Sequence, residues 1–320
     1  MSKKEVIFIV GPTATGKSQV AYLLAKRLKA EIVSCDSMLV YKEPEILTAK
    51  PAQNILSEIA HHFINLISIS EKYSVYDYCQ NAAKRIESLY KKNIPVIVCG
   101  GTGLYYKALL DGIFAQAKKD DNLRKELDEQ IEKEGLQKLY QQLKAVDPEA
   151  AEKISQNDRK RIIRALEVYR LTGEPISVKK KEAKGLWGKI PVKVFGLRLN
   201  RDKLYEKINK RVDKMFELGA VDEVKGLLNK KISMTAEKII GIKEIKDYLN
   251  NKGDSSHTGT VPLVEEAKEK IKQNTRRFAK RQITWFKKDS RIEWIDAEGK
   301  EPKGVADTIR YKVQETITKK

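Results

Sequence analysis

The first hundred residues alternate between short apolar runs and a longer segment with helical spacing. The apolar, β-branched runs at 6–10, 31–34 and 94–99 each have the length of a buried strand. Between the first two, residues 17–28 repeat apolar positions at the spacing of an amphipathic helix. Buried strands that alternate with helices predict a parallel sheet with crossover helices, and therefore an α/β fold.

The strand signal disappears in the middle of the chain and returns later. From about 120 to 184 the pattern is helical and rich in charge, whereas strand character is found again at 192–199. A helical pattern then runs from 202 to about 228. We therefore expect an all-helical insertion within one core. The expected segments are the first part of the core at 1–118, the insertion at 119–186 and the second part of the core at 187–320.

Composition places the chain among folded proteins. Of its 320 residues, 41% are hydrophobic and 33% charged, with 9 Pro and 18 Gly, which excludes collagen-like and disordered classes. The chain has no apolar run long enough to span a membrane, and the stretch at 6–10 is shorter than the hydrophobic region of a signal peptide. We therefore expect a cytoplasmic protein. Cys35, Cys79 and Cys99 are far apart, without metal-like spacing, and are expected to be reduced and buried.

The net charge indicates a polyanionic partner but does not identify its class. The chain has 63 Lys and Arg against 44 Asp and Glu, a net charge of +19. An excess of this size is typical of proteins that bind nucleic acid, but an anionic membrane or a surface adapted for solubility would also account for it.

One motif predicts a phosphate site. It fits the pattern GxxxxGK[ST], directly after the first predicted strand and at the start of the first predicted helix. The backbone N–H groups of such a loop surround a phosphate, Lys17 supplies a cation, and the Ser18 hydroxyl can bind Mg²⁺. The motif indicates a diphosphate or triphosphate ligand but names no reaction. Its residues are Gly11, Pro12, Thr13, Ala14, Thr15, Gly16, Lys17 and Ser18.

The ends of the next two predicted strands lead to the same crevice, because the carboxyl ends of parallel strands face one edge of the sheet. Asp36 follows the second strand and is a candidate base or metal ligand, although an ordinary turn or capping aspartate would occupy the same position. The third strand ends in Gly100-Gly101-Thr102, and Thr102 offers a hydroxyl. A standard ATPase would have a carboxylate there to help hold magnesium, so this ending argues against that class.

These segments resemble the tRNA dimethylallyltransferase family, also called tRNA isopentenyltransferases. The resemblance includes the segment from Asp36 to Tyr41 and Thr48-Ala49-Lys50-Pro51. Residues 157–167 resemble the signature of the family's insertion domain, and residues 275–286 resemble its C-terminal signature. The matching motifs follow the family order from residue 11 to residue 286.

The resemblance implies a reaction. A dimethylallyl group would pass from dimethylallyl diphosphate to the N6 amine of the adenosine just 3′ of the tRNA anticodon, and diphosphate would be released. Asp36 would be the general base, Thr102 would contact the nucleoside, and Arg211 would help hold the diphosphate. The residues suit this chemistry, because the phosphate loop with Mg²⁺ stabilises the leaving charge and a carboxylate can accept the amine proton.

The resemblance also implies which residues contact the tRNA anticodon stem-loop. They lie in the turns that follow the second and third predicted strands and in the insertion. They are Asp36, Ser37, Met38, Leu39, Thr102, Arg124, Lys160, Arg161, Ile162, Ile163 and Arg164. Physical reasoning adds a third region, because residues 268–291 contain ten Lys or Arg against two acids. There Arg277, Lys280 and Arg281 fall close together at helical spacing and are predicted phosphate ligands, whereas Phe278, Trp285 and Phe286 are predicted to form the buried face.

The chain departs from the family pattern at two positions. Leu39 stands where Gln is common and cannot make the hydrogen bonds of an amide, and Ile242 stands where Tyr is usual. Neither change affects Asp36, Thr102 or the phosphate loop.

We expect a monomer by default. Three other functions remain open. A related branch of the family prenylates free adenine nucleotides, but such a small acceptor needs no long basic surface. A kinase would need only the phosphate loop, the crevice and magnesium. A non-catalytic RNA-binding protein would not need the phosphate loop.

Overall fold

The computed structural model describes residues 5–114, 120–251 and 260–318. The described residues of 1–109 and 186–320 form one compact unit, and those of 110–185 form a second. The predicted boundary between residues 118 and 119 lies outside the described residues.

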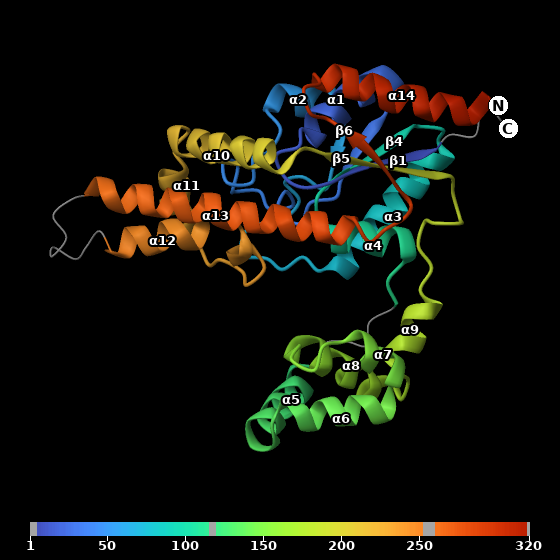
Figure 1. Cartoon of the computed structure of the whole chain (residues 1–320), viewed down its shortest axis with the longest axis vertical. Coiled ribbons are helices and arrows are strands. Elements are labelled where there is room, and N and C mark those ends of the chain that lie inside the picture. Colours follow the sequence, from blue (N-terminus) through green and yellow to red (C-terminus); the bar gives the residue numbers. More distant parts are fainter. Residues whose placement is uncertain (1–4, 115–119, 252–259, 319–320) are drawn as a thin grey trace. The chain divides into compact units, whose positions relative to one another are not determined.

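The first unit is built on a six-stranded parallel sheet with the order β3-β2-β4-β1-β5-β6. Strands β1, β4, β5 and β6 are labelled in Figure 1. Its central strands β1 and β4 are buried along their whole length, as expected for a parallel sheet covered on both faces. The predicted α/β fold is confirmed. The strands are β1 (Val6–Val10), β2 (Glu31–Ser34), β3 (His61–His62), β4 (Val96–Gly100), β5 (Val192–Arg198) and β6 (Ile292–Asp296).

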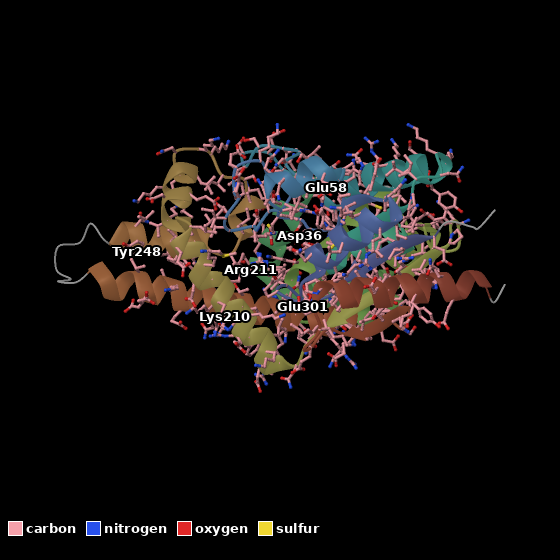
Figure 2. All side chains as sticks on the ribbon, turned by 90° about the horizontal axis from the view of Figure 1, so that it is seen from above. Asp36, Glu58, Lys210, Arg211, Tyr248 and Glu301 are labelled. Atoms are coloured by element: carbon pink, nitrogen blue, oxygen red, sulfur yellow. The ribbon has the colours of Figure 1, made fainter. Side chains whose placement is uncertain are left out.

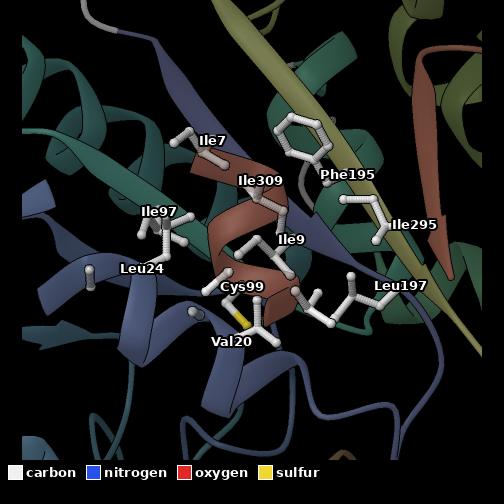
Figure 3. Packing of buried hydrophobic residues seen from close by; sticks show 14 of the residues in the cluster. Ile7, Ile9, Val20, Leu24, Ile97, Cys99, Phe195, Leu197, Ile295 and Ile309 are labelled. Carbon is white, nitrogen blue, oxygen red and sulfur yellow. The ribbon is translucent and has the colours of Figure 1, made fainter. Parts of the chain in front are cut away.

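Helices cover both faces of this sheet. Alternate strand residues point to opposite faces, so Ile7 and Ile9 of β1 pack against α1 and α14, whereas Phe8 meets Tyr106 of α4 on the other face. Figure 3 shows Ile309 of α14 in the hydrophobic cluster that contains Ile7 and Ile9. The helical elements of this unit are α1 (Lys17–Leu28), α2 (Gln53–Glu58), α3 (Val75–Lys91), α4 (Gly103–Asp111), α10 (Arg201–Glu217), α11 (Ala220–Leu228), η1 (Ala236–Lys238), α12 (Ile242–Asn251), α13 (Thr260–Phe286) and α14 (Pro302–Thr318).

One predicted strand boundary was wrong and one helical pattern is interrupted, each for a local reason. The strand predicted at 94–99 begins at Val96, because the Ile94 N–H bonds back to the Leu89 carbonyl and Pro95 has no N–H. The helical pattern predicted from 202 to about 228 is divided between two helices, α10 and α11. Gly219 separates them with a backbone φ of +93°, which favours glycine.

The break at Gly219 lets two helices contribute to a second hydrophobic cluster. Val212 and Met215 of α10 are buried there together with Val224 and Leu227 of α11. The segment after β2 joins them through Val40, Tyr41 and Leu47. This cluster therefore supports the segment that follows Asp36.

The second unit is all-helical, as predicted for the insertion. Asp158 caps α8 by accepting a hydrogen bond from the Arg161 N–H at 3.1 Å, and Asp147 caps α7 in the same way. Leucine and isoleucine side chains of its helices form one buried cluster. The helices are α5 (Asp121–Glu134), α6 (Leu136–Val146), α7 (Pro148–Lys153), α8 (Arg159–Thr172) and α9 (Ile176–Glu182).

The three cysteines lie inside the first unit. Cys35, Cys79 and Cys99 are buried and free, which confirms the predicted burial. Burial raises the pKa of the Cys79 thiol to about 11 and that of Cys99 to about 12, so both stay protonated at neutral pH. Within the described ranges, no helix is long and apolar enough to cross a bilayer.

Candidate active site

The phosphate loop joins β1 to α1 and is shaped by glycine. Gly11 has a φ of +136°, and a Cβ there would lie 2.5 Å from the Leu197 carbonyl oxygen, so no other residue fits. Gly16 precedes α1 in the left-handed region with a φ of +86°. No side chain caps α1, so its first N–H groups face the loop, as in anion sites at helix N-termini.

Lys17 points back into this loop. Its Nζ donates to the Pro12 carbonyl at 2.5 Å, and the Thr15 hydroxyl donates to the same oxygen at 2.9 Å. Burial lowers the pKa of Lys17 to about 8, with Arg211 acting in the same direction and Asp36 opposing it. The loop therefore holds a buried cation that an anionic ligand would stabilise.

Asp36 lies at the carboxyl end of β2 and is half-buried. Its Oδ1 accepts a hydrogen bond from the Met38 N–H at 2.9 Å, so the carboxylate also stabilises its own turn. The ordinary turn role and the functional role predicted from the sequence are therefore compatible, because the second oxygen is left for a ligand.

The turn after β4 is bonded to the turn that carries Asp36. The Thr102 N–H donates to the Cys35 carbonyl at 3.1 Å, and the Ser37 N–H donates to Thr102 Oγ1 at 3.0 Å. Gly100 is required at this approach, because a Cβ would lie 2.1 Å from the Cys35 carbonyl oxygen. The structure thus brings together the turns of Asp36 and Thr102, as the parallel sheet predicted.

Arg211 reaches this site from α10, more than 170 residues along the chain from Asp36. Its Nη1 donates to Thr13 Oγ1 at 3.0 Å. Burial lowers the pKa of the Arg211 guanidinium and the nearby Asp36 raises it. Asp36 and Arg211, labelled near each other in Figure 2, line the same two cavities.

Gln282 of α13 was missed by the sequence analysis. Its Oε1 accepts from the Thr13 N–H at 2.9 Å, and its Nε2 donates to the Gly101 carbonyl at 2.8 Å. The side chain is only 6% exposed. It lies inside the C-terminal signature at 275–286, but an uncharged amide gave no chemical signal beside the many cations.

Two adjoining cavities share these residues. The phosphate cavity, of about 520 Å³, is lined by the phosphate loop, Gly100 and Gly101. The apolar cavity, of about 400 Å³, is lined mainly by aliphatic side chains of the second cluster, among them Leu47 and Met215. The residues common to both cavities are Thr13, Asp36, Thr48, Arg211 and Phe278.

Comparison with known proteins gives a consistent result. A sequence model of the family described as IPP transferase matches residues 39–289. The chain is 41% identical to a tRNA dimethylallyltransferase of Natranaerobius thermophilus, over 97% of this chain and 91% of that one. It is 43% identical to a tRNA dimethylallyltransferase of Carboxydothermus hydrogenoformans, over 94% of each chain.

Solved structures agree with these relatives. The full-length tRNA isopentenylpyrophosphate transferase of Bacillus halodurans has a TM-score of 0.70 at 34% identity, over 99% of this chain and 98% of that one. A eukaryotic dimethylallyltransferase acting on tRNA has a TM-score of 0.76 at 29% identity, over 93% of this chain and 75% of that one. The chain belongs to the IPP transferase family. The resemblance drawn from the motifs is thereby confirmed, and the chain is a transferase.

In this IPP transferase, two insertion residues with an expected tRNA contact are bound to a carboxylate. Arg124 donates through Nε and Nη2 to the two oxygens of Glu167, both at 2.8 Å. Arg164 Nη1 donates to the same carboxylate at 2.7 Å, and Glu167 is fully buried. Arg124 therefore joins α5 to the Glu167 carboxylate of α8, and Arg164 pairs with the same carboxylate within α8.

The other insertion residues divide by exposure. Lys160 and Arg161 are exposed in the first turn of α8, where cations can meet phosphates. Ile162 and Ile163 are buried in the hydrophobic cluster of the second unit. Their side chains are thus committed to packing.

The basic face of α13 is largely as the pattern predicted. Arg277, Lys280 and Arg281 are exposed. Phe286 is fully buried, which agrees with the predicted buried face, but Trp285 is 38% exposed and lies over Gly103, so the prediction was wrong for Trp285.

The two departures from the family pattern have different surroundings. Leu39 lines the phosphate cavity and accepts a hydrogen bond from Asn65 through its backbone carbonyl, so its side chain adds only apolar surface. Ile242 is 3% exposed and packs in the second cluster at the start of α12. Ser37 and Met38 are half-buried beside Asp36.

Proposed function

We propose that this chain transfers a dimethylallyl group from dimethylallyl diphosphate to the N6 amine of the adenosine 3′ of the anticodon in tRNA, releasing diphosphate. The observation that carries the proposal is the pair of adjoining cavities. One offers backbone N–H groups and cations, and the other offers aliphatic walls. A donor that joins a diphosphate to an apolar five-carbon group matches this pair, with the diphosphate in the phosphate cavity and the five-carbon group in the apolar cavity.

The leaving group would be stabilised by charges already in place. Diphosphate in the phosphate loop would face the N-terminus of α1, Lys17 and Arg211, and preorganised charges of this kind stabilise a developing anion. Arg211 is held by Thr13 and does not need to reorganise.

Magnesium fits the residues present. Ser18 is exposed in the phosphate cavity, and Asp36 lines the same cavity. In the described part of the chain no cluster of three acidic, His or Cys residues offers a complete metal site. Mg²⁺ is commonly held by few protein ligands together with substrate phosphates and water, so Ser18 would bind it there, and bound Mg²⁺ supplies positive charge to the leaving diphosphate.

Asp36 would act as the base. In the transfer, the bond from N6 to the allylic carbon forms, the bond from that carbon to the diphosphate oxygen breaks, and the N6 proton passes to Asp36. One carboxylate oxygen is occupied by the Met38 N–H, which orients the other. Thr102, bonded to the same turn, would contact the nucleoside.

A tRNA acceptor is supported by charge and by the relatives, whose names describe transfer to tRNA. The net charge of +19 suits a polyanion. Exposed cations lie on α13 and at the start of α8. Because the target base is stacked in its loop, it would have to be drawn out to reach Asp36.

The test is mass spectrometry of nucleosides from unmodified tRNA incubated with the protein, Mg²⁺ and dimethylallyl diphosphate. We expect a five-carbon gain on adenosine that is nearly abolished by Asp36→Asn, which keeps the turn hydrogen bond but cannot accept the proton. Asp222→Asn, at an exposed position of α11, is the matched control. A five-carbon gain on free AMP alone would indicate that the acceptor is a nucleotide. Transfer of a phosphoryl group from ATP without the prenyl donor would support a kinase.

A further inference from the structure

Asp36 and the phosphate loop lie on separate segments that must be held in register. The turn of Asp36 is bonded to the turn after β4 through Thr102. The ladder between β1 and β4 ends at Val10 and Gly100, just before the phosphate loop and this turn diverge. Beyond that point, the two segments are bridged by the side chain of Gln282.

The bridge uses both ends of the amide. The Gln282 oxygen accepts from Thr13 in the phosphate loop, and its nitrogen donates to Gly101 in the turn after β4. A Cβ at position 101 would lie 2.3 Å from this nitrogen, so the close approach depends on glycine. An amide is the side chain that offers one donor and one acceptor in this arrangement without charge.

Thr13 is consequently held from two helices. Gln282 of α13 binds its backbone N–H, and Arg211 of α10 binds its hydroxyl. Thr13 lines both cavities, so its position defines where the phosphate cavity meets the apolar one.

We propose that Gln282 is a positioning residue for the transfer reaction, which fixes the phosphate loop relative to the turn of Asp36. This role rests on the proposed function. The phosphate loop orients the bond that breaks, and Asp36 orients the attacking amine. A change in the distance between the phosphate loop and Asp36 would therefore misalign the amine with that bond. Displacements of about 1 Å in such sites cost about 100-fold in rate.

The first test is Gln282→Glu, which places a carboxylate oxygen against the Gly101 carbonyl in place of a donor. We expect kcat for the transfer to fall by about 100-fold, while KM for tRNA and for dimethylallyl diphosphate changes by less than about threefold. Gln273→Glu makes the same change at an exposed position of α13 and is expected to keep the wild-type kcat.

The pH dependence separates positioning from general damage. A protonated carboxyl again has one donor and one acceptor, so the ratio of Q282E to wild-type kcat is expected to rise as pH falls. Gln282→Met keeps the volume of the side chain but has neither group, so its ratio to wild type is expected to stay low at every pH.

Several results would overturn the positioning role. These are a wild-type kcat in Q282E, an equal loss in Q273E, or a Q282E ratio that does not change with pH. If Q282E does not fold, a folded Q282M with wild-type kcat would overturn it, and failure of both variants to fold would make Gln282 structural. A wild-type chain that transfers no five-carbon group would instead refute the proposed function.

Discussion

Replacing Lys17 is expected to stabilise the ligand-free protein while abolishing transfer. Burial lowers the pKa of Lys17 from 10.5 to about 8, a difference of about 2.5, and each pKa unit corresponds to about 1.4 kcal/mol. Keeping the ammonium charged in the folded state therefore costs about 3 kcal/mol at neutral pH. Lys17→Met removes this cost and also a hydrogen bond to Pro12 worth about 1 kcal/mol, which leaves a net gain of about 2 kcal/mol.

The sign of the pH dependence follows from the two protonation states. Between about pH 8 and 10.5 the unfolded chain retains the Lys17 proton after the folded chain has released it. The stability of the wild type should therefore rise with pH relative to Lys17→Met. The advantage of the variant should be full at pH 7, shrink above about pH 8, and reverse as the pH approaches 10.5, because the charge cost of about 3 kcal/mol is then gone while the loss of the hydrogen bond, about 1 kcal/mol, remains.

Urea unfolding followed by tryptophan fluorescence measures this difference. Trp187, Trp285 and Trp294 all lie in the unit formed by 1–109 and 186–320, so their signal reports on the phosphate-loop unit. Lys303→Met, at an exposed lysine of α14, is the control and should change stability by less than about 0.5 kcal/mol. A Lys17→Met protein that is less stable than wild type at pH 7, or a difference that is equal at pH 7 and 10, would refute the reasoning.

Three further outcomes are expected. Glu167→Ala leaves Arg124 and Arg164 without their carboxylate and should destabilise residues 110–185 by about 3–5 kcal/mol, seen as faster hydrogen exchange there; unchanged exchange would contradict the pairing. Affinity for tRNA should fall steeply with salt, and Arg277→Ala should reduce the log–log slope by about 1, whereas a flat response would favour a nucleotide acceptor. With 2-aminopurine in place of the target adenosine, fluorescence should increase on binding, and no change would argue against extrusion of the base.

The parts of the fold that were predictable are those where burial leaves a continuous pattern. The strands at 6–10 and 31–34 and the helix at 17–28 were predicted with their observed bounds, because central parallel strands are apolar on both faces. The cap at Asp158 agrees with its residue type, because a short polar side chain can accept from the first N–H groups of a helix.

Other elements had no such signal. Strand β3 is only two histidines long, and β6 lies at the edge of the sheet, where Glu293 and Asp296 are exposed without the alternation of a half-buried strand. Arg211 could be singled out only through the resemblance, because its contact with Thr13 spans 198 positions and leaves no local pattern. Gln282 is similar, since its two partners come from segments that only the folded sheet brings together.

The geometry after β4 gives a physical reason why this phosphate loop does not belong to a standard ATPase. A magnesium-binding carboxylate at the end of the strand beside β1 would need a side chain at Gly100 or Gly101. At Gly100 a Cβ would lie 2.1 Å from the Cys35 carbonyl oxygen, and at Gly101 it would lie 2.3 Å from the Gln282 amide nitrogen. At Gly100 the close approach of the turns of Asp36 and Thr102 therefore excludes the carboxylate, and at Gly101 the Gln282 side chain occupies its place. The turn beside the proposed base thus lacks a ligand that ATP hydrolysis would use.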